Sequence, residues 1–137
     1  MAHADRAAVL ERYTRYLAAC NSRAWSEFGS HVADEVLVNG RMRTRTKYVA
    51  ELQILCESFP DYRWTLVRVL ADGDWLAVHV HDTDTRQGAF AGAPGDGTAV
   101  ETDELAMYRF GIDGRIREVE VTTDNARLIR EAPGERG

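Results

Sequence analysis

Apolar residues in the first half of the chain recur at helical spacing. Over residues 7–20 they lie three or four positions apart, so they share one face of an amphipathic helix: Val9, Tyr13, Tyr16, Leu17 and Cys20. Asn21-Ser22 ends this helix and provides the N-cap of a shorter second helix, which carries Trp25, Phe28 and Val32 on one side. A third helix, capped by Thr46, is predicted up to Phe59, because Pro60 terminates it. Between the last two helices, the β-branched residues 35–39 predict a first strand.

The period changes to that of strands from Tyr62 onward. Residues 62–70 and 75–83 are rich in β-formers, and the Asp72-Gly73 pair between them indicates a hairpin. Residues 98–110 and 115–123 repeat this arrangement around Asp113-Gly114. Residues 87–97 hold several glycines and a proline, so they predict a loop between the hairpins.

This order of elements predicts the α+β class. A parallel sheet would need a helix between each pair of strands, and the second half of the chain has none. We therefore expect three N-terminal helices packed on a curved antiparallel β-sheet. Such a sheet leaves a cone-shaped cavity between the two layers, where a small ligand can bind.

Composition narrows the range of partners. The 137 residues indicate one domain over residues 1–137, with a flexible tail at 132–137. The net charge of −5, without a Lys/Arg cluster, argues against nucleic acid or an anionic membrane as a partner. Apolar runs are too short for a membrane span or a signal peptide, so we expect a cytoplasmic protein. Cys20 and Cys56 fall on apolar helical positions and are expected to be unpaired core thiols.

Several motifs, in this order and spacing, resemble one family. They are Phe59-Pro-Asp-Tyr-Arg-Trp64, Asp72-Gly-Asp74, Gly88-x-Phe90-x-Gly-x-Pro94, Tyr108-Arg-Phe110, Asp113-Gly-Arg-Ile116 and Asp124. Together the motifs, over roughly residues 9–129, resemble the SnoaL-like polyketide cyclases and ester cyclases of the nuclear transport factor 2-like fold. The resemblance implies a cyclase, isomerase or lyase of secondary metabolism and antibiotic biosynthesis that needs no cofactor. Its small-molecule substrate would be polyketide-like or another secondary metabolite.

The chain departs from the family pattern at two places. Arg86 stands where many relatives have a loop histidine, and Val119-Glu120 replaces a His-Trp pair on the last strand. The resemblance implies that Asp124 is the general acid/base, which takes a proton from carbon next to a carbonyl. An apolar cavity suits this role by raising the pKa of a carboxyl group. The structural alternative is that Asp124 caps a terminal helix at residues 125–131.

His79 and His81 are the second candidate group. On a strand they point to one face, where they can hydrogen-bond a substrate carbonyl or carry a proton. A His-x-His pair is also half of a three-ligand metal site, and its third ligand would be Asp84, Glu101, Asp103 or Glu104. We expect no metal, and the metal-dependent lyase is the alternative function. The remaining alternative is purely structural, with one histidine exposed and the other at the core edge.

Tyr16 matches the position of the oxyanion-holding tyrosine of ketosteroid isomerases. Steroid isomerisation is nevertheless not expected, because neither Asn39-Gly40 nor Ala106 supplies that site's carboxylates. Tyr16 is expected to act as a hydrogen-bond donor to the substrate. The predicted substrate contacts are Asn39, Glu104, Glu120, Trp64, Tyr108 and Phe90.

The last strand presents a conflict of register. Asp124 shares a face with Glu120, whereas the apolar Val119 and Val121 point the other way. A bulge before Asp124, valines buried against a second subunit, or Asp124 outside the cavity would each resolve the conflict. We expect the second, a homodimer paired through the valines with Glu120 and Asp124 facing the cavity. A non-catalytic small-molecule-binding protein is the other alternative function, and a cavity lined only by apolar side chains would favour it.

Overall fold

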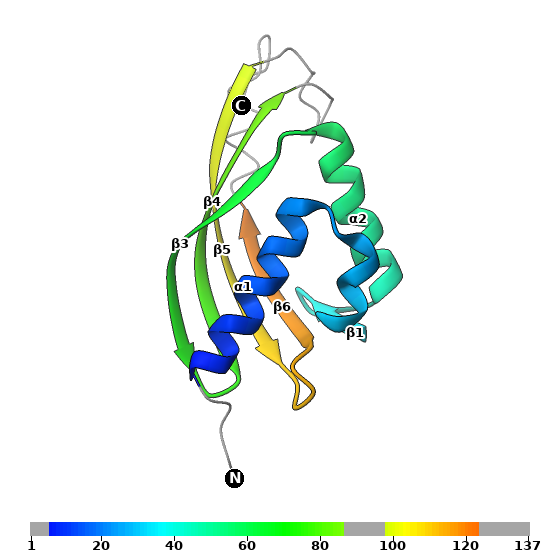
Figure 1. The fold of residues 1–137 in the computed structure, drawn as a ribbon, viewed down its shortest axis with the longest axis vertical. Helices are drawn as coiled ribbons and strands as arrows, with labels where there is room; N and C mark the ends of the chain where they lie inside the picture. The colour runs from blue at the N-terminus through cyan, green and yellow to red at the C-terminus, as the bar shows by residue number, and fades with distance from the viewer. Residues whose placement is uncertain (1–5, 87–97, 124–137) are drawn as a thin grey trace.

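The computed structural model describes residues 6–86 and 98–123. Figure 1 shows helices on one side of a long, curved sheet. In chain order the elements are α1 (Arg6–Ser22), η1 (Trp25–Ser30), β1 (Val32–Val38), β2 (Arg41–Thr44), α2 (Arg45–Ser58), β3 (Arg63–Asp72), β4 (Trp75–Arg86), β5 (Thr98–Phe110) and β6 (Ile116–Thr123).

In the helical half of the chain, the predicted second helix differs from the prediction. Helix α1 buries the predicted apolar face. The element expected to be a second helix is the 3-10 helix η1, so the described part has two α-helices and one short 3-10 helix. Val32, expected on that helix, instead begins strand β1 and is fully buried. The expected strand over residues 35–39 therefore starts earlier.

Helix α2 begins at a different cap. Thr44 has an extended backbone (φ −74°, ψ 153°), and its side chain accepts a hydrogen bond from the Lys47 N–H at 3.2 Å. Thr46, the expected cap, lies inside the first turn. The prediction was wrong because strand β2, which the sequence pattern did not reveal, brings extended backbone up to Thr44. Past the other end of α2, the Phe59 N–H donates to the Leu55 carbonyl oxygen at 2.9 Å, just before Pro60.

The sheet has six strands in the order β2-β1-β6-β5-β4-β3. Both predicted hairpins are present, and Gly73 and Gly114 occupy their turns with φ of 62° and 82°. The expectation of a wholly antiparallel sheet was wrong, because β1 pairs with β6 in parallel. The chain runs through α2 and four more strands between these two, and such a long connection allows parallel neighbours.

The two faces of the sheet have different surroundings. The helices cover the inner face, where α1 contacts β3 and β4 and α2 contacts β1 (Figure 1). Aromatic rings fill the space between them, with the Tyr13 and Tyr108 ring centroids 5.1 Å apart. The outer face is not covered by any described element. Within the described ranges, no helix is long and apolar enough to cross a membrane.

The last strand corrects the predicted register. Val119 is 2% exposed and Val121 packs partly buried against the same core, so the two valines face the helices. Glu120 lies on the outer face, opposite Met107. The expectation of valines in a dimer interface, with Glu120 facing the cavity, was therefore wrong. A register shift between the Arg109–Glu118 and Phe110–Ile116 pairs places Ile116 and Val119 on one face despite their odd spacing.

Candidate functional site

A cavity of about 210 Å³ lies between the helices and the inner face of the sheet. Its wall is mainly aromatic and aliphatic, with a few polar groups. The lining residues are Tyr13, Tyr16, Leu17, Cys20, Val38, Tyr48, Glu51, Leu52, Leu55, Trp64, Glu104, Tyr108, Val119 and Val121. An apolar wall with a small number of polar groups is typical of small-molecule sites. We call this space the inner cavity.

Two tyrosine hydroxyls meet on the wall of the inner cavity. The Oη atoms of Tyr16, on α1, and Tyr48, on α2, are 2.6 Å apart and hydrogen-bonded. Burial raises the pKa of both hydroxyls, so they keep their protons at neutral pH. Hydroxyls in contact polarise one another, which makes the pair a suitable donor to a ligand oxygen.

Two carboxyl groups lie together on the inner face of the sheet. Asp82 of β4 and Glu104 of β5 occupy neighbouring strands, where Asp82 pairs with Thr102 and Val80 with Glu104. They are therefore diagonal neighbours on one face. The two residues are 1% and 9% exposed. The Tyr62 hydroxyl donates to Asp82 Oδ2 at 2.7 Å. Glu104 reaches the cavity wall, and Asp82 is not among the lining residues.

Burial and proximity change the acidity of this pair. Burial raises the pKa of Asp82, as does the neighbouring Glu104 carboxyl, to about 9. Burial also raises the pKa of Glu104, while its hydrogen bond with Asp82 acts the other way. Two adjacent buried carboxyls cannot both ionise easily, so the pair retains a proton near neutral pH. The inner cavity thus has an acid/base group on its wall.

The two histidines lie on the other side of the sheet. Their rings do share one face, as expected, but it is the outer face, and Tyr16 lies on the inner side. His79 Nε2 donates to Asp103 Oδ1 at 2.9 Å. His81 contacts Asp103 through Nδ1 at 3.2 Å and Glu101 through Nε2 at 2.8 Å. These bonds, first that to Glu101, raise the pKa of His81.

The histidines and carboxylates described on the outer face are not arranged as a metal site. Both ring nitrogens of His81 are hydrogen-bonded to carboxylates, Nδ1 to Asp103 and Nε2 to Glu101. Within residues 6–86 and 98–123, no group of three or more His, Cys, Asp or Glu side chains is arranged to hold a metal ion.

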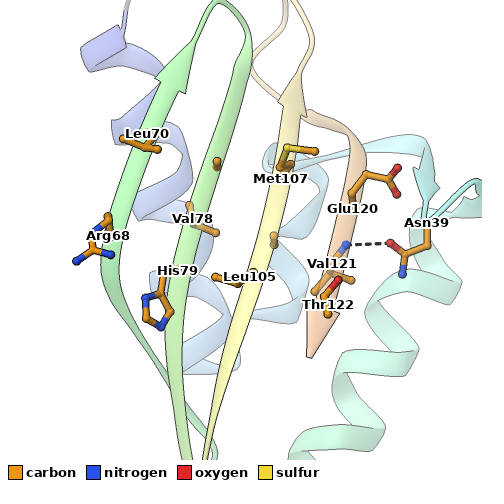
Figure 2. A pocket seen from close by; sticks show the side chains of 12 residues that line it. Asn39, Arg68, Leu70, Val78, His79, Leu105, Met107, Glu120, Val121 and Thr122 are labelled. Carbon is orange, nitrogen blue, oxygen red and sulfur yellow. Dashed lines mark hydrogen bonds between the residues drawn. The ribbon is translucent and has the colours of Figure 1, made fainter. Parts of the chain in front are cut away.

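A larger hollow, about 580 Å³, lies on the outer face (Figure 2). Asn39 and Glu120 line it together with His79. Asn39 has a φ of 49°, and its Oδ1 accepts the Val121 N–H at 2.9 Å, so its side chain joins the turn after β1 to β6. The charged groups here are solvent-exposed. The inner cavity is the better candidate active site, because burial there alters the acidity of the groups it contains.

The predicted site residues thus separate into three groups. Those on the inner cavity are Tyr16, Trp64, Glu104 and Tyr108. Those on the outer hollow or its face are Asn39, His79, His81 and Glu120. Asp124, Phe90 and the predicted helix at 125–131 lie outside the described residues.

Sequence reasoning missed Asp82 and Tyr48. A signal for Asp82 was present, because the alternation of Leu76, Val78 and Val80 continues onto it. The same alternation directs His79 and His81 to the opposite face. No comparable signal marked Tyr48, because its contact with Tyr16 joins helices that are distant in sequence.

Comparisons with known proteins were made for sequence and for structure. The model of the SnoaL-like polyketide cyclase family matches residues 10–132. No curated protein sequence matches the chain. Among solved structures, a SnoaL-like polyketide cyclase from Agrobacterium tumefaciens is 28% identical, with a TM-score of 0.82 over 90% of this chain and 96% of that one.

Two further structures come from Streptomyces. IdmH of Streptomyces antibioticus, proposed to be a polyketide cyclase, is 23% identical, with a TM-score of 0.79 over 88% of this chain and 94% of that one. AclR of Streptomyces galilaeus, proposed to be a hydroxylase, is 21% identical, with a TM-score of 0.78 over 91% of this chain and 95% of that one. At these identities, the likeness to the two Streptomyces proteins shows the fold.

Proposed function

Because the chain belongs to the SnoaL-like polyketide cyclase family, we propose that it is a cofactor-independent cyclase or isomerase. It transfers protons on a small polyketide-like substrate held in the inner cavity. The observation that carries this proposal is the carboxyl group of Glu104 on the wall of a cavity lined by tyrosines. The relatives named as polyketide cyclases support a substrate from secondary metabolism.

The cavity wall supplies the groups that this reaction needs. A proton leaves carbon next to a carbonyl most easily when hydrogen-bond donors stabilise the charge that develops on the oxygen. The hydroxyls of Tyr16 and Tyr48 are such donors. The rings of Trp64 and Tyr108 provide flat apolar surface for the rest of the substrate. The family resemblance adds Asp124 as a proposed base and Phe90 as a proposed contact.

The two alternative functions receive less support. A non-catalytic binder was expected to have a cavity lined only by apolar groups, whereas the inner cavity has hydroxyl and carboxyl groups. A metal-dependent lyase was expected to use His79 and His81, whose ring nitrogens are hydrogen-bonded to carboxylates on the opposite face. Acid/base catalysis in the inner cavity is therefore the function we propose.

The test is proton exchange on carbon. Aryl 1,3-diketones and aryl β-keto esters in D2O serve as probes, and NMR follows loss of the proton between the carbonyls. We expect the protein to accelerate this exchange and Leu52→Trp, which fills the inner cavity, to lower the rate about tenfold or more. Ile54→Trp is the matched control, because Ile54 is on the same helix but 61% exposed. Equal rates for the two variants would contradict a reaction in the inner cavity.

We also propose that two copies of the chain pair through the outer face of the sheet. Leu70, Leu105 and Met107 are 63%, 59% and 47% exposed there and form an apolar patch. Arg68 on β3 and Glu120 on β6 lie on opposite sides of this patch (Figure 2). Neither charge has an ion-pair partner among the described residues. A twofold axis along the strands brings each Arg68 to the partner's Glu120 side, so the face is complementary to itself.

A further inference from the structure

We propose that Glu104 is the catalytic base of the inner cavity and that Asp82, behind it, is a positioning residue that holds the one proton that the pair retains. This inference rests on the proposed function and assigns the proton transfer to two residues of the sheet. It differs from the assignment to Asp124, which the family resemblance implies. The two assignments make opposite predictions for the same assay.

The geometry gives the two carboxyls different roles. Glu104 lies on the wall of the inner cavity with Tyr16 and Tyr48, so it is the member of the pair that a bound molecule can reach. Asp82 is 1% exposed, and its Oδ2 accepts the Tyr62 hydroxyl at 2.7 Å. The other oxygen, Oδ1, is buried without a hydrogen-bond partner in the described part of the chain. A bare anionic oxygen there would be costly, whereas a proton on Asp82 can be directed at the adjacent Glu104 carboxylate.

The surroundings favour one shared proton. Among the described residues, the titratable groups around the pair are acidic or neutral: Tyr13 and Cys20 from α1, Tyr48 from α2, Tyr62 before β3, Asp84 from β4 and Tyr108 from β5. Among the side chains of residues 6–85 and 101–122, no ion pair joins an arginine, lysine or histidine to Asp82 or Glu104. Without a cation to neutralise it, a pair of buried carboxyls lowers its charge by keeping a proton. The pair then has a single negative charge.

The proton transfer can be written in full. The Glu104 carboxylate takes a proton from the carbon next to a substrate carbonyl, the C–H bond breaks, and its electron pair moves onto the carbonyl oxygen as an enolate. A tyrosine hydroxyl on the wall donates a hydrogen bond to that oxygen. Glu104, now a neutral acid, returns its proton to the same or another carbon. Asp82 keeps its own proton throughout, so nothing is oxidised or reduced.

The first test needs no substrate. The protein is labelled with 13C at its Asp and Glu carboxyl carbons, and NMR follows Asp82 and Glu104 over pH. We expect one carboxyl of the pair to remain protonated at neutral pH. In Glu104→Gln we expect the pKa of Asp82 to fall, because the neighbouring carboxyl helps to raise it. Full ionisation of both carboxyls at neutral pH, each titrating independently, would overturn the shared proton.

The second test uses the diketone exchange assay. Glu104→Gln should lower the rate about a hundredfold or more, as expected for loss of a general base. Asp82→Asn keeps a donor next to Glu104, so we expect it to retain exchange with its pH profile shifted. Glu101→Gln is the matched control, because Glu101 lies on the same strand but on the outer face.

The outcomes separate this inference from the proposed function. If Asp124→Asn abolishes exchange and Glu104→Gln does not, the role of Glu104 is overturned and the proposed function stands. An unshifted pH profile in Asp82→Asn would overturn the positioning role of Asp82. If no probe is turned over although the carboxyl pair holds its proton in the NMR titration, the proposed function fails, and the catalytic role of the pair fails with it. Circular dichroism of each variant tests whether a lower exchange rate comes from loss of folding.

Discussion

Asp82 makes the stability of this protein depend on pH. Its pKa is raised from 3.8 to about 9 in the folded state, first by burial and then by Glu104. Between these values the folded protein holds a proton that the unfolded chain has released. The free energy of unfolding therefore falls as pH rises through this window, by at most about 1.4 kcal/mol per pH unit.

Urea unfolding at several pH values inside this window measures the effect. We expect Asp82→Asn to lose stability less steeply than the original protein as pH rises. Asp61→Asn is the matched control, because hydrogen bonds from Thr85 lower the pKa of Asp61. The stabilisation from Asp61 is present above its ordinary pKa and is lost on acidification, so its removal leaves the slope in the window unchanged. Parallel pH profiles for the Asp82 variant and the original would contradict a raised pKa.

At the scale of single residues, the sequence predicted which residue types belong to the site better than it predicted the face of the sheet on which each residue lies. Glu104 and Tyr16 were expected at the site and line the inner cavity. His79 and His81 were expected to join them, but strand alternation takes the histidines to the outer face. The histidines were chosen as candidates for their chemistry. Asp82 could have been identified only by following the alternation of β4 beyond Val80. The apolar pattern of a strand indicates which face of the sheet each of its residues occupies. The chemical type of a residue does not.

At the scale of elements, helix α2 begins at the Thr44 cap, one turn before Tyr48, whose hydroxyl contacts Tyr16. Removing the Thr44 side chain leaves the Lys47 N–H without its partner, so Thr44→Ala should lower the free energy of unfolding by about 1 kcal/mol. Thr46→Ala is the control: it lies exposed inside the helix, where alanine is favourable, and should cost nothing. Urea denaturation measures both. A larger loss at Thr46 would place the start of the helix where the sequence suggested.

The elements themselves were mostly predictable because hydrophobic period and turn residues act locally. Helix α1, helix α2 and both hairpins follow from spacing, Pro60 and the Asp-Gly turns. The short strand β2 and the parallel pairing of β1 with β6 did not, since both depend on contacts between distant segments. The register shift that turns Val119 toward the core also could not be predicted, because a regular strand alternates its side chains strictly between the two faces.

At the scale of the whole molecule, the proposed pairing of two copies predicts how reversing the charges of Arg68 and Glu120 changes dimer formation. Arg68→Glu and Glu120→Arg should each shift the dimer toward monomer in analytical ultracentrifugation, because each places like charges opposite one another. The double variant restores opposite charges and should recover the dimer. Glu57→Arg, an exposed change on α2, is the control. A monomeric original protein, or single variants that dimerise as the original does, would contradict pairing through this face.

The molecule has two hollows in which a substrate could bind. One lies between the layers and contains buried acid and hydroxyl groups, and the other is larger and lies on the outer face. The most direct measurement is the intermolecular NOE between a bound aryl 1,3-diketone and the protein. We predict NOEs to the ring protons of Tyr16 and Tyr108, which line the inner cavity. NOEs to the methyl groups of Leu105 and Met107 instead would place binding on the outer face and contradict the account.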